Sequence, residues 1–583
     1  MKPRSIVRRL IQTDHPLLAQ ARWHPVLCRV YAARGIADAE AMDLRLTHLA
    51  SPATLGGLDT ACDILIDAIR AQKSILVVGD FDVDGATGTA VALRGLRMLG
   101  AERVSFRVPN RFVHGYGLST ALVAELALQA PDVLITVDNG IACVAGVAAA
   151  KALGCTVIVT DHHLPGAELP AADAIVNPNL QHDAFPSKAL AGVGVMFYLL
   201  LALRSRLREK GWFEREGGPE DRRSVPDLSL LLDLVALGTV ADLVPLDRNN
   251  RVLVAAGLRR INAGLACAGV AALLRVAGRD CARTDASDLG FVVGPRINAA
   301  GRLDDMSIGI QCLMSDNTEQ ATRCATQLDT INRERREVQA DMVGEAEQWL
   351  ALHHADTSAL PAALCLFDAR WHAGVVGLVA SKLKERVHRP VIAFAPAIEG
   401  SEEIKGSARS IPGVNIRDLL AEVNAMHPGL IARFGGHAMA AGLSIERCNL
   451  ERFRTALDEL ARARIDPILF DSCLLSDGAL RAEDIDFALA EALRGGGPWG
   501  QAFPEPLFDG EFHVESARVM AGKHLGLRLR CVDSGRPFDA VHFGGYDGAL
   551  PAGRWHVAYI PQVDQWRDES RLRLMIRHAI QVS

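Results

Sequence analysis

The sequence of 583 residues predicts a mixed α/β protein with several domains, and three observations lead to that prediction. At about 150 residues per domain, the chain is too long for a single hydrophobic core. From about residue 60 to about residue 260, short β-branched runs alternate with segments rich in Ala and Leu, which is typical of a parallel sheet covered by helices. Beyond residue 465 the pattern changes to short strands separated by turn residues.

The expected elements of the N-terminal half follow from these patterns. Residues 1–55 are predicted to be a helical lead-in, because apolar residues are loosely spaced between charges. A parallel-sheet domain is expected over residues 56–316, with the polar segment 214–226 as a surface insertion. Its clearest strands are the apolar runs at residues 74–78, 132–137 and 155–160.

A long helix should separate this domain from the C-terminal half. Apolar residues recur with helical spacing over residues 317–352, which predicts a helix roughly 50 Å long. Its other face is charged, so it is expected to connect two bodies rather than fill one core. A smaller α/β domain is expected over residues 353–464. Residues 465–583 are predicted to form a small β-barrel or sandwich, with strands at 526–530 and 555–560.

Composition excludes several classes of protein. Hydrophobic residues make up 49% of the chain and charged residues 23%, as in ordinary folded domains rather than disordered ones. The first residues are basic but are not followed by an apolar run, so no secretory signal is expected. The longest apolar stretch, residues 189–203, is shorter than a bilayer requires. The 12 cysteines form no C-x-x-C pair, so we expect reduced thiols and a cytoplasmic protein without a membrane partner.

Acidic and histidine side chains follow each of the three predicted strands. They are Asp80, Asp82 and Asp84 after the first strand, Asp138 after the second, and Asp161, His162 and His163 after the third. The carboxyl ends of parallel strands form a ligand-binding crevice, so these side chains should converge. Carboxylates this close cannot all be ionised without a cation, which predicts divalent metal. Mn²⁺ or Mg²⁺ suits such ligands; iron and zinc stay open, while the absence of cysteine disfavours structural zinc.

A further acid is embedded in an apolar run. Asp242 lies within residues 234–246, whose other members are all uncharged. It is either a fourth member of the metal cluster or the cap of a helix.

These motifs resemble those of the DHH phosphoesterase superfamily, and within it the branch of bacterial single-strand-specific exonucleases. The matching motifs are DFDVDG at 80–85, VDNG at 137–140, TDHH at 160–163, LGTVADLVPL at 237–246, GPRINAAGRL at 294–303 and FGGHAMAAG at 434–442. The resemblance implies a DHH domain and a DHH-associated domain joined by the long helix, followed by an oligonucleotide-binding (OB) barrel.

The resemblance also implies roles for the clustered residues. Asp82 and Asp84 would bind different metals, Asp138 would bridge both, and His162 and Asp242 would complete the second site. Asp80 would serve the first site or orient the attacking water. His163 would face the scissile phosphate, with Asp161 as a further catalytic residue. Pyrophosphatase-like members carry a histidine where this chain has Val78, so the full ligand set of the first site stays open.

The expected substrate contacts come from three other short segments of the sequence. Ser407 and Arg409 resemble a pocket for a terminal 5′-phosphate, since serine and arginine offer hydrogen bonds and a charge-assisted grip. Gly435, Gly436 and His437 resemble a backbone contact near the cleft, and Arg296, Asn298 and Arg302 resemble residues that line the strand channel.

The resemblance implies 5′→3′ removal of mononucleotides from single-stranded DNA by two-metal hydrolysis, in recombination and repair. A single-strand binding protein and a RecQ-type helicase are the implied partners. Two alternatives remain: a DHH phosphodiesterase of short oligonucleotides or cyclic dinucleotides, and a non-catalytic DNA-binding scaffold. The intact acids and histidines argue against the scaffold.

The formal net charge of −6 is compatible with a nucleic-acid partner. At least six carboxylates belong to the predicted cluster, where two divalent ions would cancel about four negative charges. Residues 516–583 carry 10 Lys and Arg against 6 acids. The charge therefore excludes a uniformly basic DNA coat but not a locally basic channel.

Overall fold

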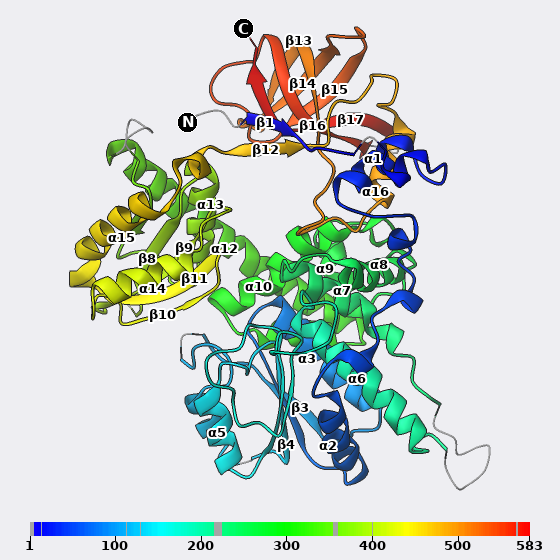
Figure 1. The fold of residues 1–583 in the computed structure, drawn as a ribbon, viewed down its shortest axis with the longest axis vertical. Coiled ribbons are helices and arrows are strands. Elements are labelled where there is room, and N and C mark those ends of the chain that lie inside the picture. Colours follow the sequence, from blue (N-terminus) through cyan, green and yellow to red (C-terminus); the bar gives the residue numbers. More distant parts are fainter. Residues whose placement is uncertain are drawn as a thin grey trace. The chain divides into compact units, whose positions relative to one another are not determined.

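The computed structural model of the chain contains two compact units, each assembled from separate stretches of sequence (Figure 1). It describes residues 5–12, 14–111, 113–128, 130–214, 224–353, 360–398, 400–566 and 569–582. The larger unit comprises Leu10–Asn332 and Asp486–Pro506, and the smaller unit comprises Met1–Arg9, Arg333–Ile485 and Leu507–Ser583. Most of the expected insertion at 214–226 lies outside the described residues. Within the described ranges, no helix is both long and apolar enough to cross a membrane.

A five-stranded parallel sheet lies at the centre of the larger unit. Its order is β3-β2-β4-β5-β6. The strands are β2 (Ile75–Gly79), β3 (Val104–Arg107), β4 (Val133–Val137), β5 (Thr156–Thr160) and β6 (Ala174–Val176). Every residue of β2 and β4 is buried, as expected for strands covered on both faces. The three strands predicted from the sequence are β2, β4 and β5, so the predicted parallel sheet is confirmed.

Helices cover both faces of this sheet. Side chains that alternate along the strands, such as Leu134 and Val157, pack on one face with residues of α4 (Thr120–Glu125) and α5 (Val144–Ala152). The other face contacts α3 (Val83–Met98) and α6 (Gly192–Glu209). The remaining helices of this part are α2 (Leu58–Arg70), α7 (Leu232–Ala241), α8 (Arg248–Asn262), α9 (Ala268–Val276), α10 (Gly294–Leu303) and α11 (Ser307–Met314).

A segment late in the sequence returns to the larger unit. Helix α16 (Phe487–Gly495) contacts α1 (Pro25–Ala33), and the Tyr31 hydroxyl donates to the Gly496 carbonyl at 2.8 Å. The rings of Trp499 and Phe503 stack at 5.1 Å. The sequence analysis divides the chain into consecutive domains and assigns all of residues 465–583 to the last one, so it does not place Asp486–Pro506 in the larger unit. The predicted domain boundaries stay a prediction.

The long helix predicted at residues 317–352 is α12 (Thr318–His353). Residues spaced with helical periodicity, among them Ala321, Ala325 and Leu328, are buried. The boundary between the two units falls within this helix, because Asn332 belongs to the larger unit and Arg333 to the smaller one.

The smaller unit begins with a second five-stranded sheet, of order β10-β11-β9-β8-β7. Its strands are β7 (Leu364–Phe367), β8 (Val391–Pro396), β9 (Glu403–Arg409), β10 (Arg433–Gly436) and β11 (Ala440–Glu446). Only β7 and β8 pair in parallel. The helices of this part are α13 (Val376–Val387), α14 (Ile416–Met426) and α15 (Leu450–Arg464). The predicted second α/β domain is thus confirmed.

The C-terminal strands form a closed barrel of order β13-β14-β15-β17-β16, so the sequence alternatives are resolved in favour of a barrel. The strands are β13 (Phe508–Met520), β14 (His524–Cys531), β15 (Pro537–His542), β16 (Gly553–Trp566) and β17 (Glu569–Gln581). The N-terminal strand β1 (Ser5–Arg8) pairs with β12 (Cys473–Ser476). Arg8 donates hydrogen bonds from Nε and Nη2 to the carboxylate of the buried Asp509 of β13.

Candidate metal centre

Three acidic residues lie in register at one edge of the parallel sheet. Gly79 of β2 pairs with Val137 of β4, and Val137 pairs with Thr160 of β5. The residues that follow these three are Asp80, Asp138 and Asp161, and each is at most 4% exposed. The parallel pairing therefore brings the predicted acids to the same edge, where ligands bind in open α/β sheets.

The loop after β2 is held in place by its own carboxylate and by α10. Asp82 is the N-cap of α3 and accepts a hydrogen bond from the Gly85 amide at 3.0 Å. The Asn298 side chain accepts from the Val83 amide at 3.1 Å. Gly85 has no room for a side chain, since a Cβ would lie 2.4 Å from the Asp80 carbonyl oxygen. The DFDVDG motif thus needs its glycine for a close backbone approach.

Asp84 is buried in the first turn of α3 and accepts hydrogen bonds from the backbone of another helix. Its two carboxylate oxygens accept hydrogen bonds from the Gly192 and Val193 amides at 2.6 and 2.8 Å. Both amides belong to the first turn of α6, where the helix dipole favours an anion. Burial and the charge of Asp82 raise the pKa of Asp84 to about 7, against the pull of the two amides.

Asp138 lies at the centre of the cluster and has an unusual backbone. Its φ of 63° is in the left-handed region, where a residue other than glycine is strained, and such strain is concentrated at functional sites. The Tyr116 hydroxyl donates to the Asp138 carbonyl at 3.0 Å. The His162 Nε2 atom lies 3.1 Å from Asp138 Oδ1. Among the described residues, none donates a hydrogen bond to this oxygen.

Asp242 and His162 complete the cluster from α7 and from the loop after β5. Asp242 is the C-cap of α7, and its Oδ2 lies 3.5 Å from His162 Nε2. The same nitrogen lies 4.0 Å from Asp84 Oδ2. Helix α7 approaches α3 closely at Gly238, where a Cβ would lie 3.0 Å from Asp84 Oδ1. Asp242 therefore directly follows the last residue of α7, and its carboxylate lies beside the His162 ring.

The described residues form three groups in which all donor atoms lie within 4.8 Å of one another. The groups are Asp80, Asp82 and Asp138; Asp84, His162 and Asp242; and Asp138, His162 and His163. Asp138 belongs to two of them. Every predicted metal ligand is included, and Asp80 joins the first group.

The electrostatics of these groups favour bound cations. Burial raises the pKa of Asp80, Asp138 and Asp242 well above the ordinary value, and the neighbouring carboxylates raise it further. The Oδ1 atoms of Asp80 and Asp138 are buried, yet no described residue donates to them. Divalent cations would offset both costs, and the mixture of carboxylate oxygen and imidazole nitrogen suits Mn²⁺ or Mg²⁺.

Asp161 lies outside the three groups and holds the two histidines. Its Oδ1 accepts from the His162 and His163 amides at 2.8 and 3.1 Å and from His163 Nδ1 at 2.7 Å, while Oδ2 accepts from the Ile141 amide at 2.9 Å. Burial raises the pKa of Asp161, but His163 outweighs it and the net shift is downward. Burial lowers the pKa of His163, whereas Asp161 and the neighbouring acids raise it overall.

The predicted channel residues on α10 lie close to the cluster, but two of them are used inside the protein. The guanidinium of buried Arg296 donates to Asp329 at 2.9 Å and to the Val292 carbonyl at 2.6 Å. Asn298 caps the start of α3, as described above. Arg302 is partly exposed near the end of the same helix. Asn298 thus supports the metal-binding loop, whereas Arg296 joins α10 to Asp329 of α12.

Ser407 and Arg409 form a separate polar site in the smaller unit. Arg409 Nη1 donates to Ser407 Oγ at 2.9 Å and to the Ala408 carbonyl at 2.8 Å. Helix α13 begins against both: a Cβ on Gly377 would lie 2.8 Å from Arg409 Nη2 and 2.9 Å from Ser407 Oγ. A helix N-terminus beside a guanidinium and a hydroxyl is suited to an anion.

A strip without side chains borders this site. Ser407 pairs with Gly442, and Gly442 pairs with Gly435; a Cβ on either glycine would contact nothing within 4 Å. Gly436 follows Gly435 in β10, and the His437 amide donates to the Ala440 carbonyl at 2.8 Å. The five substrate residues predicted in this unit therefore lie on neighbouring strands or at their ends.

Some residues of the two sites were not predicted from the sequence. They are Tyr116 and the backbone amides of Gly192 and Val193 at the cluster, and Gly377 beside Ser407. Tyr116 stands between two glycines that both have positive φ, a pattern that marks an unusual loop. Gly192 begins a G-V-G run after a loop, which resembles a site of close backbone approach.

Comparison with protein-family models gives three matches in sequence order. Residues 74–239 match the DHH family N-terminal domain, residues 358–463 the DHHA1 domain, and residues 476–578 the RecJ OB domain. The third match coincides with most of the C-terminal barrel.

Curated proteins and solved structures are also similar. The chain is 46% identical over 579 residues to the single-stranded-DNA-specific exonuclease RecJ of Salmonella typhimurium, covering 99% of both chains. It is 45% identical over 568 residues to the protein of that name from Escherichia coli, covering 97% of both. The crystal structure of RecJ in complex with Mn²⁺ from Thermus thermophilus matches with a TM-score of 0.82 at 29% identity, over 100% of this chain and 80% of that one.

Proposed function

Since the chain belongs to the RecJ family of single-stranded-DNA-specific exonucleases, we propose that it removes mononucleotides from single-stranded DNA in the 5′→3′ direction. It is a metal-dependent nuclease of the DHH family, and structures of its relatives hold Mn²⁺ or Mg²⁺. The observation that carries the proposal is the set of three donor groups at the strand ends, two of which contain Asp138.

We assign the ligands from these groups. Asp80, Asp82 and Asp138 would hold one cation, and Asp84, His162 and Asp242 the other. Asp138 is assigned to both sites, because its Oδ1 lies 3.1 Å from His162 Nε2. Two divalent cations supply a lowered pKa for water and neutralise charge on the phosphate and the leaving oxygen. Asp80 thereby provides a donor for the first cation where Val78 provides none.

His163 would act on the scissile phosphate, and Asp161 would position it. Nδ1 of His163 donates to Asp161, so any contact with the phosphate falls to Nε2. The raised pKa of His163 favours the protonated ring, which can stabilise a phosphate oxygen or donate a proton to the leaving group. Asp161 acts through His163 and through the amides that it fixes.

The 5′→3′ direction is supported by the site at Ser407, Arg409 and the start of α13. This site combines a hydroxyl, a guanidinium and a helix N-terminus, which is the chemistry that a terminal 5′-phosphate requires. The strip formed by Gly442 and Gly435 leaves room for a nucleic-acid backbone beside it. Gly436, His437 and Arg302 are assigned to strand contacts on the family resemblance.

The barrel supports a long strand as substrate rather than a dinucleotide. Barrels of the OB type bind single strands with loops and with the surface of the second and third strands. The match to the RecJ OB domain and the complete set of metal donors favour the exonuclease over both a small-substrate phosphodiesterase and an inactive scaffold. We further propose a role in recombination and repair beside a single-strand binding protein and a RecQ-type helicase.

The test uses Asp138→Asn on single strands labelled at one end. Asparagine tolerates the left-handed backbone of this position, so the fold should persist. We expect wild type to release labelled mononucleotides at once from a 5′-labelled strand and only at the end of digestion from a 3′-labelled one. The variant should bind the strand and fail to cut it. Normal cutting by Asp138→Asn would contradict the ligand assignment, and early release from the 3′ label would contradict the direction.

A further inference from the structure

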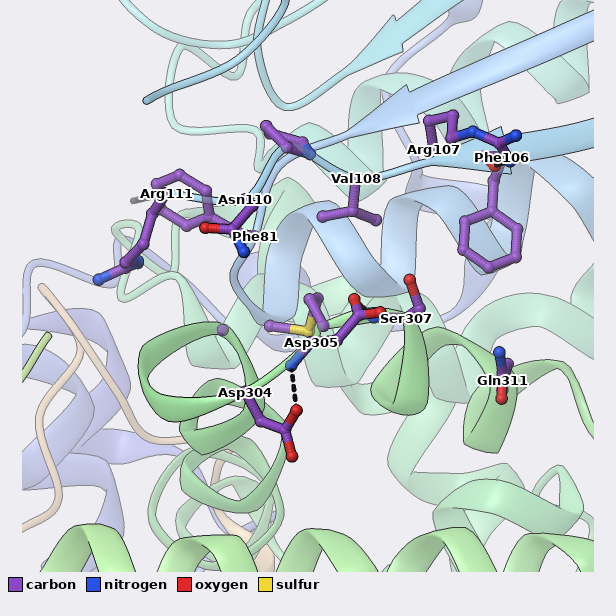
Figure 2. Close-up of a pocket in the computed structure, with 13 residues that line it drawn as sticks. Phe81, Phe106, Arg107, Val108, Asn110, Arg111, Asp304, Asp305, Ser307 and Gln311 are labelled. Carbon is purple, nitrogen blue, oxygen red and sulfur yellow. Dashed lines mark hydrogen bonds between the residues drawn. The ribbon is translucent and has the colours of Figure 1, made fainter. Parts of the chain in front are cut away.

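A cavity of about 450 Å³ lies beside the metal-binding loop, on the larger unit (Figure 2). Small-molecule sites commonly have volumes of roughly 300–1,000 Å³, so the cavity is large enough for a ligand. The loop after β3 lines one side with Arg107, Asn110 and Arg111, and the turn from α10 into α11 lines the other. None of the functions assigned above uses this cavity.

The cavity borders the metal-binding loop through Phe81. This residue stands between Asp80 and Asp82, and its ring lines the cavity. Helix α10 packs tightly behind the loop, since a Cβ on Gly301 would lie 2.0 Å from the Phe81 carbonyl oxygen. A molecule in the cavity would therefore lie next to the residues that hold the first cation.

Arg111 supplies a positive charge to the wall of the cavity, beside Phe81. Its guanidinium lies 4.1 Å from the centre of the Phe81 ring, and the charges of Asp80 and Asp82 act on it. Its buried Nε donates no hydrogen bond to any described residue. A buried, unsatisfied guanidinium nitrogen is costly unless a ligand accepts from it, and a guanidinium binds phosphate through charge-assisted hydrogen bonds that are often bidentate.

The opposite wall offers hydrogen-bond acceptors and an amide. Asp304 Oδ1 accepts from the Asp305 amide at 2.8 Å, and Asp305 Oδ1 accepts from the Ser307 amide at 2.8 Å (Figure 2). Each carboxylate therefore keeps one oxygen outside these bonds. Gln311 adds a donor and an acceptor in the next turn of α11. Such groups are complementary to the amino edge of a nucleobase.

We propose that this cavity holds the released 5′-mononucleotide, with its phosphate toward Arg111 and its base toward Asp305 and Gln311. The inference rests on the proposed function, because the nuclease supplies the mononucleotide. The cavity is lined by guanidinium groups, by carboxylate and amide acceptors and by aromatic rings, and this combination of groups is complementary to a nucleotide. Holding the product there would clear the strand end for the next nucleotide.

The test measures binding of dCMP directly, by calorimetry with the full-length protein in Mg²⁺. The nucleotide has no phosphodiester bond, so it cannot be cut. Gln311→Ala and Asp305→Asn each remove one base contact from an exposed position, and each should weaken dCMP binding by about fivefold, the loss expected for one hydrogen bond. Glu319→Gln is the matched control, because this exposed acid of α12 lies outside the cavity and pairs with Arg323. It should bind dCMP as wild type does.

Three outcomes would overturn the proposal. They are no dCMP binding by wild type, dCMP binding by both cavity variants as tight as that of wild type, and inorganic phosphate binding as tightly as dCMP. If the cavity variants bind dCMP as wild type does, Arg409→Ala shows where the nucleotide binds. Loss of dCMP binding in the Arg409→Ala variant would place the nucleotide at the Ser407 site. The outcome for the proposed function is separate, because strand cutting is measured with DNA alone.

Discussion

Replacing Gly192 by alanine should damage the metal centre without removing any ligand. Gly192 is the first residue of α6, and its amide donates to Asp84 at 2.6 Å. A Cβ at this position would lie 2.6 Å from Asp138 Cβ and 2.9 Å from Asp138 Cα and Oδ1. Carbon atoms pack at about 3.5–4.0 Å, so either Asp138 or the start of α6 must move by about 1 Å.

The cost of this movement has two parts. Forcing one extra methyl group into a packed region destabilises a protein by about 1–3 kcal/mol. A displacement of about 1 Å in a catalytic group lowers the rate by about 100-fold. Movement of Asp138 would disturb both proposed cation sites, and movement of α6 would weaken the hydrogen bonds to Asp84. Both responses should raise the Mn²⁺ concentration needed for activity.

The assay compares kcat/KM on a 5′-phosphorylated single strand over a range of Mn²⁺ concentrations, together with thermal unfolding. Gly344→Ala is the matched control, because Gly344 lies within α12 and a Cβ there would contact nothing within 4 Å. It should keep full activity and gain up to about 1 kcal/mol of stability from helix propensity. A Gly192→Ala protein with wild-type kcat/KM at limiting Mn²⁺ would refute the packing argument.

Three other predictions concern the strand end, the core and pH. Arg409→Ala should remove the preference for a 5′-phosphate over a 5′-hydroxyl, and competition between the two strands measures it; an unchanged preference would exclude this pocket. Asp329→Ala should lower the free energy of unfolding by about 3–5 kcal/mol, because it leaves buried Arg296 without its partner; a loss near zero in denaturant titration would contradict the buried pair. Burial raises the pKa of Asp509, but hydrogen bonds from Arg8, Ser476 and His556 lower it overall. The ionised Asp509 should therefore add to the free energy of unfolding above about pH 4, and this contribution should be lost at lower pH. Comparison of wild type with Asp509→Asn from about pH 5 to about pH 3 should show their stabilities converging, and parallel curves would contradict the shift.

Much of the metal centre could be predicted because its residues lie next to strong local signals. Asp80, Asp138 and Asp161 directly follow apolar strands, and parallel pairing brings the ends of such strands together. The amides of Gly192 and Val193 could not be predicted, because they approach Asp84 from a helix more than 100 residues away and carry no chemical signature.

The roles of individual polar residues depend on contacts that the sequence does not reveal. Asp161 resembles the other acids in sequence, yet its oxygens accept four hydrogen bonds and it joins no metal group. Arg296 and Asn298 belong to a motif expected to contact the strand, but one pairs with Asp329 and the other caps α3. The role of such a residue depends on its hydrogen-bond partner, and the packing of the folded chain determines which residue that partner is.

The most direct test of the two-cation centre is a count of bound Mn²⁺ by electron paramagnetic resonance, with strand cutting measured on the same samples. Wild type should bind two Mn²⁺ per chain, one at the donor atoms of Asp80, Asp82 and Asp138 and one at those of Asp84, His162 and Asp242. Asp138→Asn should bind fewer and lose cutting, whereas Asp161→Asn should keep both ions and lose activity through His163. Two bound ions with undiminished cutting in Asp138→Asn would contradict the account.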